Sequence, residues 1–227
     1  MHAEHAHFET TPARRPLGRF GAAVKRAEDL MLGLPLLVLF LPAMLVIGVL
    51  VRLDSPGPAL FRQPRHGFHG RVITVRKFRT MRDDCADVAG ARQEEDHDPR
   101  VTRVGRVLRR LRLDELPQLL NVVEGTMSLV GPRPYPAGMM IGSHPARDEL
   151  AKHARRNAVK PGITGWAQVN GLAGAVTSDV ELRRRIAYDL HYVHNWSVAL
   201  DLLILARTAW LVVRQAARPL LKRWRRR

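Results

Sequence analysis

The sequence predicts an α+β chain that is mostly helical, with an N-terminal re-entrant membrane helix, a small β-hairpin and amphipathic interfacial helices. Three observations support this fold class. No residue from Leu30 to Val51 is charged. Two short stretches rich in β-forming residues flank a possible turn at Gly67 to Gly70. From Val101 to Leu111 apolar residues recur at helical spacing.

The uncharged segment is long enough to cross a bilayer, because about 22 residues of helix reach roughly 33 Å. Pro42 lies near its middle, removes a backbone donor and disfavours helical geometry at Leu41. A turn at Pro42 places both basic flanks on the cytoplasmic side, which favours a re-entrant helical hairpin. A proline-kinked spanning helix is the alternative. Residues at the basic flanks are Arg14, Arg15, Arg19, Lys25 and Arg26 before the segment, and Arg52, Arg62 and Arg65 after it.

Composition indicates an anionic partner. The 227 residues include 37 lysines and arginines and 21 acidic residues, a net charge of +16. Such a charge attracts phosphorylated lipid, a nucleotide or nucleic acid, and does not choose among them. The single cysteine, Cys85, excludes an intramolecular disulfide and a thiolate zinc cluster, and fits a reducing cytoplasm.

The C-terminal end predicts a second membrane contact. The stretch from Leu200 to Val213 is largely apolar and contains Trp210, and the stretch from Arg214 to Arg227 holds seven basic and no acidic residues. This pattern is typical of an interfacial helix followed by a polybasic tail. Nucleic-acid binding is the competing interpretation, and no interleaved aromatic pattern accompanies it.

Between these ends the sequence predicts one soluble unit. Ser55 to Pro58 is a turn, and the hairpin strands are Ala59 to Arg62 and Arg71 to Phe78. Arg82 to Pro99 is a polar loop, and a helix covers about Asp179 to Tyr192. We therefore divide the chain into a basic segment (1–24), a membrane hairpin (25–56), a cytosolic catalytic domain (57–199) and a membrane-surface segment (200–227).

A pair of carboxylates follows the basic helix over Val101 to Leu111. Asp114 is a good N-cap for a helix that ends at Gly125, and an N-cap carboxylate stays ionised beside backbone N–H groups. Asp114 and Glu115 together could attack a phosphate or share Mg²⁺. When the pair is considered alone, ordinary helix capping is the favoured explanation.

Two loops add candidate residues. In Gly131 to Pro134, prolines on both sides of Arg133 fix its backbone, which suits either a phosphate-binding guanidinium or a plain loop arginine. In Pro161 to Gln168, Trp166 either holds a nucleotide or belongs to the core. Asp96 to Asp98 imitates an Asp-x-Asp metal motif but lacks a preceding apolar strand, and the histidines lack the spacing of a zinc site.

Several of these stretches resemble the monotopic phosphoglycosyl transferases of the bacterial sugar transferase family, in its minimal form. The resemblance covers about Lys25 to Leu205 in family order. The matching stretches are Lys77 to Met81, Asp98 to Thr102, Leu113 to Leu119, Asn121 to Val123, Met127 to Pro134 and Pro161 to Gly171. One departure is Leu41 before Pro42, where the family usually has serine.

The resemblance implies an enzyme with Asp114 as nucleophile and Glu115 as the second residue of a catalytic dyad. Asp114 attacks a UDP-sugar, UMP leaves, and polyprenyl (undecaprenyl) phosphate accepts the phosphosugar. Mg²⁺, held by Asp114 and Glu115, is the implied cofactor. The positions implied for substrate binding are Lys77, Arg79, Arg109, Pro132, Arg133 and Gln168, and Pro42 is the membrane break.

The expected location is the bacterial inner membrane, with the catalytic domain on the cytoplasmic face. The expected partners are a UDP-sugar, polyprenyl phosphate and the lipid bilayer, with no nucleic acid, and a homodimer is possible. A non-catalytic membrane adapter that binds anionic lipid or a protein partner is the alternative function. The sequence leaves the sugar and the glycoconjugate pathway open.

Overall fold

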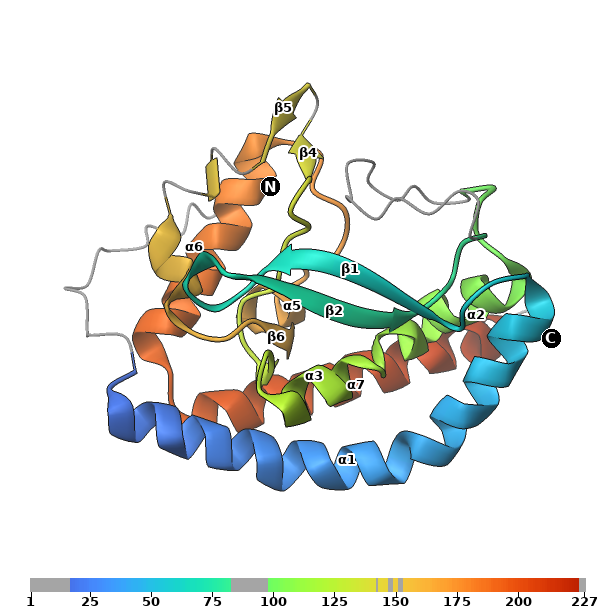
Figure 1. Cartoon of the computed structure of the whole chain (residues 1–227), viewed down its shortest axis with the longest axis horizontal. Helices are drawn as coiled ribbons and strands as arrows, with labels where there is room; N and C mark the ends of the chain where they lie inside the picture. Colours follow the sequence, from blue (N-terminus) through green and yellow to red (C-terminus); the bar gives the residue numbers. More distant parts are fainter. Residues whose placement is uncertain (1–16, 83–97, 142, 147–148, 151–152, 225–227) are drawn as a thin grey trace.

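A single long helix, α1 (Arg19–Asp54), runs along one side of the computed structural model, and the other elements lie on one side of it (Figure 1). The structure describes residues 17–82, 98–141, 143–146, 149–150 and 153–224. Cys85, most of the predicted loop from Arg82 to Pro99 and most of the basic segment 1–24 therefore lie outside the described residues. The described part is mostly helical with small sheets, as predicted.

Helix α1 passes through Pro35 and Pro42 without interruption, and Figure 1 shows it bending along its length. The chain is therefore not broken at Pro42 as predicted, and the re-entrant topology of this helix stays a prediction. A proline inside a helix removes one backbone hydrogen bond and crowds the preceding turn, and the neighbouring hydrogen bonds can hold the helix together as it bends. By length and composition α1 can cross a membrane.

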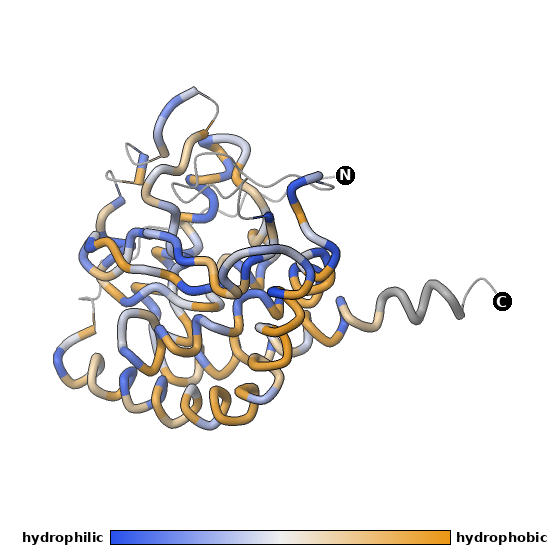
Figure 2. The backbone as a smooth tube through the Cα atoms, turned by 45° about the vertical axis from the view of Figure 1, so that its right-hand side comes forward, coloured by the Kyte–Doolittle hydropathy of each residue, from blue (hydrophilic) through white to orange (hydrophobic). Residues whose placement is uncertain are grey.

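Hydrophobic side chains on α1 are largely uncovered, and Met31 is 75% exposed. Helix α7 (Val198–Trp224) is joined to α1 by the ion pair between Asp201 and Lys25, and it also exposes apolar residues, including Trp210. Figure 2 shows the hydrophobic residues concentrated along the edge that α1 forms. An apolar surface of this extent is typical of a membrane contact, and it extends over both segments for which the sequence predicted one.

The predicted β-hairpin is confirmed. Strand β1 (Leu60–His66) pairs antiparallel with β2 (Val72–Phe78), and the short helix η1 (Phe68–Gly70) forms the turn. Strand β1 is longer than predicted because it continues through Pro64. The Pro64 carbonyl accepts from the Ala137 amide on the edge away from β2, so the missing N–H of this proline also faces that edge and removes no hydrogen bond between β1 and β2.

Helix α2 (Arg103–Leu111) confirms the predicted basic helix. Its N-terminus is capped by Thr102, whose side-chain oxygen accepts a hydrogen bond from the Gly105 amide. Gly105 lies against the Thr80 carbonyl so closely that a Cβ there would meet it at 2.2 Å. This approach fixes α2 beside the end of β2.

The connection after α2 differs from the prediction. Arg112 takes a left-handed conformation (φ 56°) and ends α2. The next residues form the short helix η3 (Leu113–Glu115), and α3 (Gln118–Glu124) starts only after Pro117. The predicted role of Asp114 as an N-cap is therefore wrong, because the chain has not yet entered α3 at that residue.

Short elements complete the body. Strand β3 (Ser128–Val130) pairs parallel with β6 (Gly162–Thr164), which brings two distant glycine-containing loops together. Gly131 and Gly162 are in backbone contact, since a Cβ on either would meet the other's chain within 3 Å. The remaining elements are β4 (Met140–Ile141), β5 (His144–Pro145), η4 (Ala154–Ala158), α5 (Trp166–Val169) and α6 (Asp179–Asn195). Helix α6 confirms the predicted helix in this region.

Candidate active site

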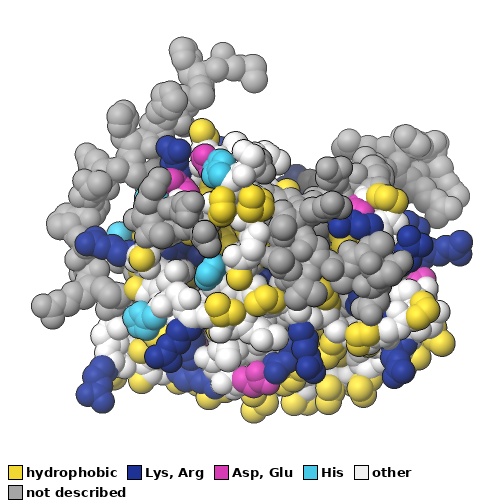
Figure 3. Space-filling view, turned by 45° about the horizontal axis from the view of Figure 1, so that its top comes forward, with side chains coloured by type: hydrophobic (Ala, Val, Ile, Leu, Met, Phe, Trp, Pro, Cys, Tyr) yellow, Lys and Arg dark blue, Asp and Glu magenta, His cyan; other side chains and the backbone are white. Residues whose placement is uncertain are grey.

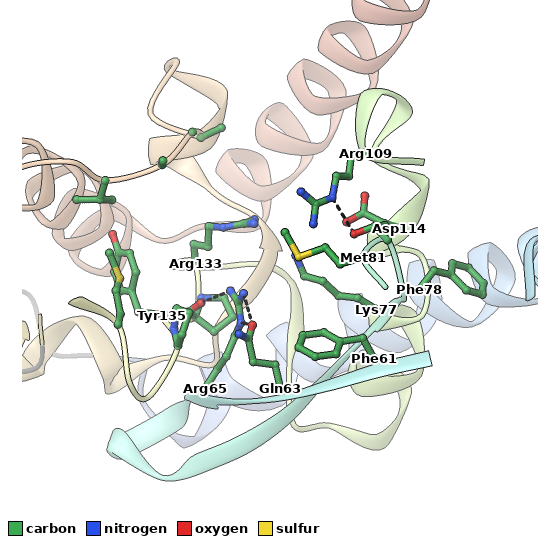
Figure 4. Close-up of a pocket in the computed structure, with 18 of the residues that line it drawn as sticks. Phe61, Gln63, Arg65, Lys77, Phe78, Met81, Arg109, Asp114, Arg133 and Tyr135 are labelled. Carbon is green, nitrogen blue, oxygen red and sulfur yellow. Dashed lines mark hydrogen bonds between the residues drawn. The ribbon is translucent and has the colours of Figure 1, made fainter. Parts of the chain in front are cut away.

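A cavity of about 330 Å³ lies between the β-hairpin, η3 and the loop after β3 (Figure 4). Its wall is rich in basic side chains, and Asp114 is its one carboxylate among the residues described. Apolar side chains such as Phe61 and Met81 form part of the wall near Asp114. The basic residues of the wall are Arg65, Lys77, Arg79, Arg100, Arg109, Arg133 and Arg185.

Glu115 lies behind the cavity wall and pairs with two of these cations. Its Oε1 atom is 2.9 Å from Lys77 Nζ and 2.8 Å from Arg133 Nη2. Burial alone raises the pKa of Glu115, but the charges of Arg133 and Lys77 outweigh it and hold that pKa well below its usual range. Glu115 is therefore ionised, and it holds two cations from distant segments at one edge of the cavity.

Asp114 faces the cavity itself. Figure 4 shows its carboxylate and the Arg109 guanidinium pointing toward one another. Arg109 is oriented from behind by a hydrogen bond of its Nε to Thr80 Oγ1, at 2.7 Å. Because η3 is a tight turn, adjacent side chains point in different directions. This turn lets Asp114 reach the cavity while Glu115 stays in the ion pairs.

The Arg133 loop is held by a buried ion pair that sequence reasoning missed. Arg156 on η4 donates through Nε to Asp189 on α6, at 2.7 Å, and through Nη2 to the backbone carbonyl of Arg133. Its guanidinium also stacks 4.5 Å from the centre of the Tyr135 ring. Burial raises the pKa of Asp189, and the charge of Arg156 opposes this rise. Arg156 and Asp189 are 33 residues apart, and no local pattern links them.

The structure separates the six predicted substrate-binding residues into two groups. Lys77, Arg79, Arg109 and Arg133 line the cavity. Pro132 and Gln168 do not line it. The Pro132 carbonyl accepts from the Gly162 amide, and the Gln168 side chain donates to the Ile163 carbonyl, so both stabilise the paired loops behind the cavity.

Arg79 lines the cavity and is also bonded to the end of α1. Its Nη2 donates to the Ser55 carbonyl and hydroxyl at the C-terminal end of α1, at 2.5 and 3.0 Å. The Trp166 ring stacks with His191 on α6 and lies 5.3 Å from the Arg207 guanidinium on α7. Trp166 therefore takes the core role of the two that the sequence left open.

Comparison with known proteins decides the family. A family model described as bacterial sugar transferase matches residues 20–215. The chain belongs to the bacterial sugar transferase family.

Relatives in this family include an undecaprenyl-phosphate glucose phosphotransferase from Komagataeibacter xylinus, 45% identical over 199 residues, which are 88% of this chain and 37% of the relative. An exopolysaccharide production protein PSS from Rhizobium leguminosarum bv. phaseoli is 45% identical over 185 residues, 82% of this chain and 92% of the relative. A UDP-glucose:undecaprenyl-phosphate glucose-1-phosphate transferase from Escherichia coli is 43% identical over 195 residues, 86% and 41% of the two chains. The chain thus spans about two fifths of the length of the first and third of these relatives.

Two further arginines belong to the site of this bacterial sugar transferase and were not predicted. Arg65 on β1 donates to the Pro134 carbonyl and to the Gln63 side chain, and Arg185 on α6 donates to the carbonyls of Gly174 and Ala175. Each lines the cavity while it holds a loop of the wall in place. The sequence around Arg65 and Arg185 carries no pattern that indicates this role, because basic residues are common in strands and helices.

The site offers few protein ligands for a divalent cation. Within the described ranges no group of three or more His, Cys, Asp or Glu side chains comes together. Glu115 is already neutralised by Lys77 and Arg133, which leaves Asp114 as the carboxylate on the cavity side. Mg²⁺ is commonly held by one or two carboxylates together with substrate phosphates, and this donor set is compatible with that arrangement.

The Asp-x-Asp motif takes no part in the cavity where it can be followed. Asp98 pairs with Arg100, with its Oδ2 2.6 Å from Arg100 Nη2. Asp96 and His97 lie outside the described residues.

Proposed function

We propose that this chain transfers a sugar 1-phosphate from a UDP-sugar to polyprenyl (undecaprenyl) phosphate, with release of UMP. The names of two family relatives, which specify UDP-glucose or undecaprenyl phosphate, support this reaction. The observation that carries the proposal is the placement of Asp114 on the wall of a basic cavity, beside Arg109 and next to Glu115, which pairs with Lys77 and Arg133. A carboxylate among so many cations suits attack on a polyanionic phosphate.

The proposed reaction has two steps at one phosphorus atom. First, a carboxylate oxygen of Asp114 forms a bond to the phosphorus that carries the sugar, and the bond from that phosphorus to the bridging oxygen breaks. UMP leaves with the electron pair. Second, an oxygen of polyprenyl phosphate forms a bond to the same phosphorus, and the bond to Asp114 breaks. Asp114 thereby returns as a carboxylate without any oxidant or reductant.

Charge neutralisation is the main task of the surrounding residues. Lys77 and Arg133 stand at one edge of the cavity and can bind diphosphate oxygens as charge builds on the leaving group. Glu115 acts through these two side chains as a positioning residue, because a carboxylate whose pKa is held far below neutrality is a weak proton acceptor. Mg²⁺, which Asp114 would hold with phosphate oxygens, adds further neutralisation of the diphosphate when it is bound.

The proposal places the reaction at the cytoplasmic face of the inner membrane, with α1 re-entrant so that both of its ends lie on that face. The bend of α1, the basic residues on both flanks and its exposed apolar surface support this topology. Reporters fused before Leu30 and after Val51 test it. Signals from opposite sides of the membrane would refute the re-entrant topology.

The chemistry is tested with the full chain in lipid and a UDP-sugar labelled in its β-phosphate, beginning with UDP-glucose. Before acceptor is added, we expect the wild-type protein to carry label and UMP to be released. The label should leave the protein once polyprenyl phosphate is added, and Asp114→Asn should carry no label. Arg184→Gln, a change at an exposed residue outside the cavity wall, is the matched control and should label normally. A wild-type protein that binds lipid but releases no UMP from any UDP-sugar of a panel supports the membrane adapter instead.

A further inference from the structure

A second, smaller cavity lies beside the N-terminal half of α1. It has a volume of about 90 Å³, and three basic side chains and one acidic side chain line it: Lys25, Arg26, Lys160 and Asp29. Leu17 and Phe68 add apolar wall. The proposed transfer reaction uses none of these residues.

The four charges do not cancel within the cavity. Asp29 is satisfied by Lys25, the Ser128 hydroxyl and the Leu129 amide, all within 3.1 Å of its Oδ1 atom. Lys25 is itself also paired with Asp201, at 2.8 Å. Among the residues described, two cations, Arg26 and Lys160, therefore have no carboxylate paired with them.

Arg26 and Lys160 lie side by side. Arg26 donates to the carbonyls of Val122 and Val123 at the end of α3, and both its guanidinium and the Lys160 ammonium come within 3.5 Å of the place that a Cβ on Gly125 would occupy. In the part of the chain that the structure describes, Lys160 has no hydrogen-bond or ion-pair partner. Burial and the neighbouring Arg26 lower the pKa of Lys160, whereas Asp29 raises it. An anion between the two cations would relieve their repulsion.

The position of Arg26 on α1 indicates where that anion comes from. Arg26 precedes the uncharged segment by one helical turn, about 6 Å, and so lies where an apolar helix meets lipid headgroups. Phe20 and Met31, on either side of it along α1, are 83% and 75% exposed. Figure 3 shows lysine and arginine side chains directly above a row of hydrophobic side chains at the molecule's lower edge.

We propose that Arg26 and Lys160 bind the headgroup phosphate of an anionic membrane lipid in this cavity. The volume suits a phosphate group and is too small for a nucleotide sugar, whose pockets are several times larger. The guanidinium offers fixed donors and the ammonium a mobile point charge, a combination that suits phosphate oxygens. The site rests on the membrane contact of α1 and is independent of the transfer chemistry.

The test measures how fast an amine-reactive acylating reagent modifies each lysine of the full chain in vesicles, by mass spectrometry. One set of vesicles is pure phosphatidylcholine, and the other contains a minor fraction of phosphatidylglycerol. Relative to Lys77, which lies in the other cavity, we expect Lys160 to react about fivefold more slowly when phosphatidylglycerol is present. Arg26→Gln should remove most of this protection, and Arg155→Gln, which removes an exposed cation nearby in sequence, should not.

Three results overturn the proposal. The first is an unchanged ratio of Lys160 to Lys77 in the wild type, which does not depend on how any variant folds. The second is equal slowing of both lysines, which indicates only the general surface potential of the vesicle. The third is full protection of Lys160 in phosphatidylcholine vesicles by added inorganic phosphate, which assigns the site to a soluble anion. Absence of the covalent label on Asp114 affects none of these readouts, so failure of the proposed reaction remains distinguishable.

Discussion

Two buried ionic clusters with opposite composition organise this molecule. In the Glu115 cluster one carboxylate lies between two cations, Lys77 and Arg133, at the edge of the larger cavity. In the Lys25 cluster one ammonium lies among three carboxylates, those of Glu28, Asp29 and Asp201. Asp29 and Asp201 also accept hydrogen bonds from neighbouring groups of the protein. The donors to these carboxylates include the Ser128 hydroxyl, the Leu129 amide, the Tyr192 hydroxyl and the Trp196 indole.

The two clusters have different roles, one in the fold and one in the proposed chemistry. The Lys25 cluster joins α1, β3 and α7, and hydrogen bonds within the protein satisfy Asp29 and Asp201. Among the residues described, the buried oxygens of its third carboxylate, Glu28, have no hydrogen-bond partner. The Glu115 cluster leaves the outer sides of its cations directed at a cavity large enough for a substrate. A buried cluster whose cation is already paired with carboxylates stabilises a fold, whereas one with two cations facing a large cavity can also bind an anion.

Removal of the cation from the Lys25 cluster should have the largest effect on stability. Lys25→Met leaves Asp29 and Asp201 buried without their counter-charge, which costs about 3–5 kcal/mol of the free energy of unfolding. Denaturant unfolding of the detergent-solubilised protein measures this loss. Arg19→Met removes an exposed cation from the same helix and should cost little. Equal losses for the two variants would show that the cluster does not hold α1 in place.

Glu115→Gln should affect activity more than stability. The variant releases Lys77 and Arg133 toward a cavity where water can solvate them, so its unfolding free energy should fall less than that of Lys25→Met. We expect the UMP release rate to fall about 100-fold, or about 2.7 kcal/mol of transition-state stabilisation. The control is Glu124→Gln, which breaks an exposed ion pair with Arg76 and should leave the rate unchanged. A Glu115→Gln protein with normal turnover contradicts the positioning role.

Arg156→Lys tests the support behind Arg133. A lysine cannot donate to both Asp189 and the Arg133 carbonyl with the geometry of a guanidinium, so Arg133 should be held less well. We expect KM for the UDP-sugar to rise about tenfold, close to 1.4 kcal/mol, with a smaller change in kcat. Arg155→Lys, at the neighbouring exposed position, is the control. If kcat and the free energy of unfolding instead fall together, Arg156 has a purely structural role.

The pH dependence of stability should show the smallest effect. Because the pKa of Glu115 is lowered in the folded protein, its stabilising contribution is fully present above the unfolded-state pKa of about 4.3 and is lost as pH falls through the folded-state value. Unfolding free energies of wild type and Glu115→Gln should therefore differ by a constant amount from pH 7 to about pH 5 and converge below that. A difference that stays constant down to the acid limit of folding would contradict the lowered pKa.

Local patterns in the sequence predicted local structure well. The turn glycines gave the β-hairpin, and the apolar stripe from Val101 to Leu111 gave α2. The position of Asp114 could not be predicted in the same way, because it depends on the left-handed conformation of Arg112, a residue that rarely adopts it. Strands β3 and β6 were missed because three-residue strands carry too little alternation to be recognised.

The candidate site was predicted by resemblance more than by pattern. The resemblance selected Lys77, Arg109 and Arg133, and all three line the cavity with Asp114. It also selected Gln168, whose side chain instead bonds the backbone of its own loop. The Arg156–Asp189 pair depends on two elements that meet only in the folded chain.

The bond from Arg79 to Ser55 links the last turn of α1 to the strand that carries Lys77. On the proposed topology this link fixes the distance between the cavity and the bilayer surface. A lipid acceptor would then be selected by the depth of its phosphate in the membrane, and the length of its hydrocarbon tail would matter much less.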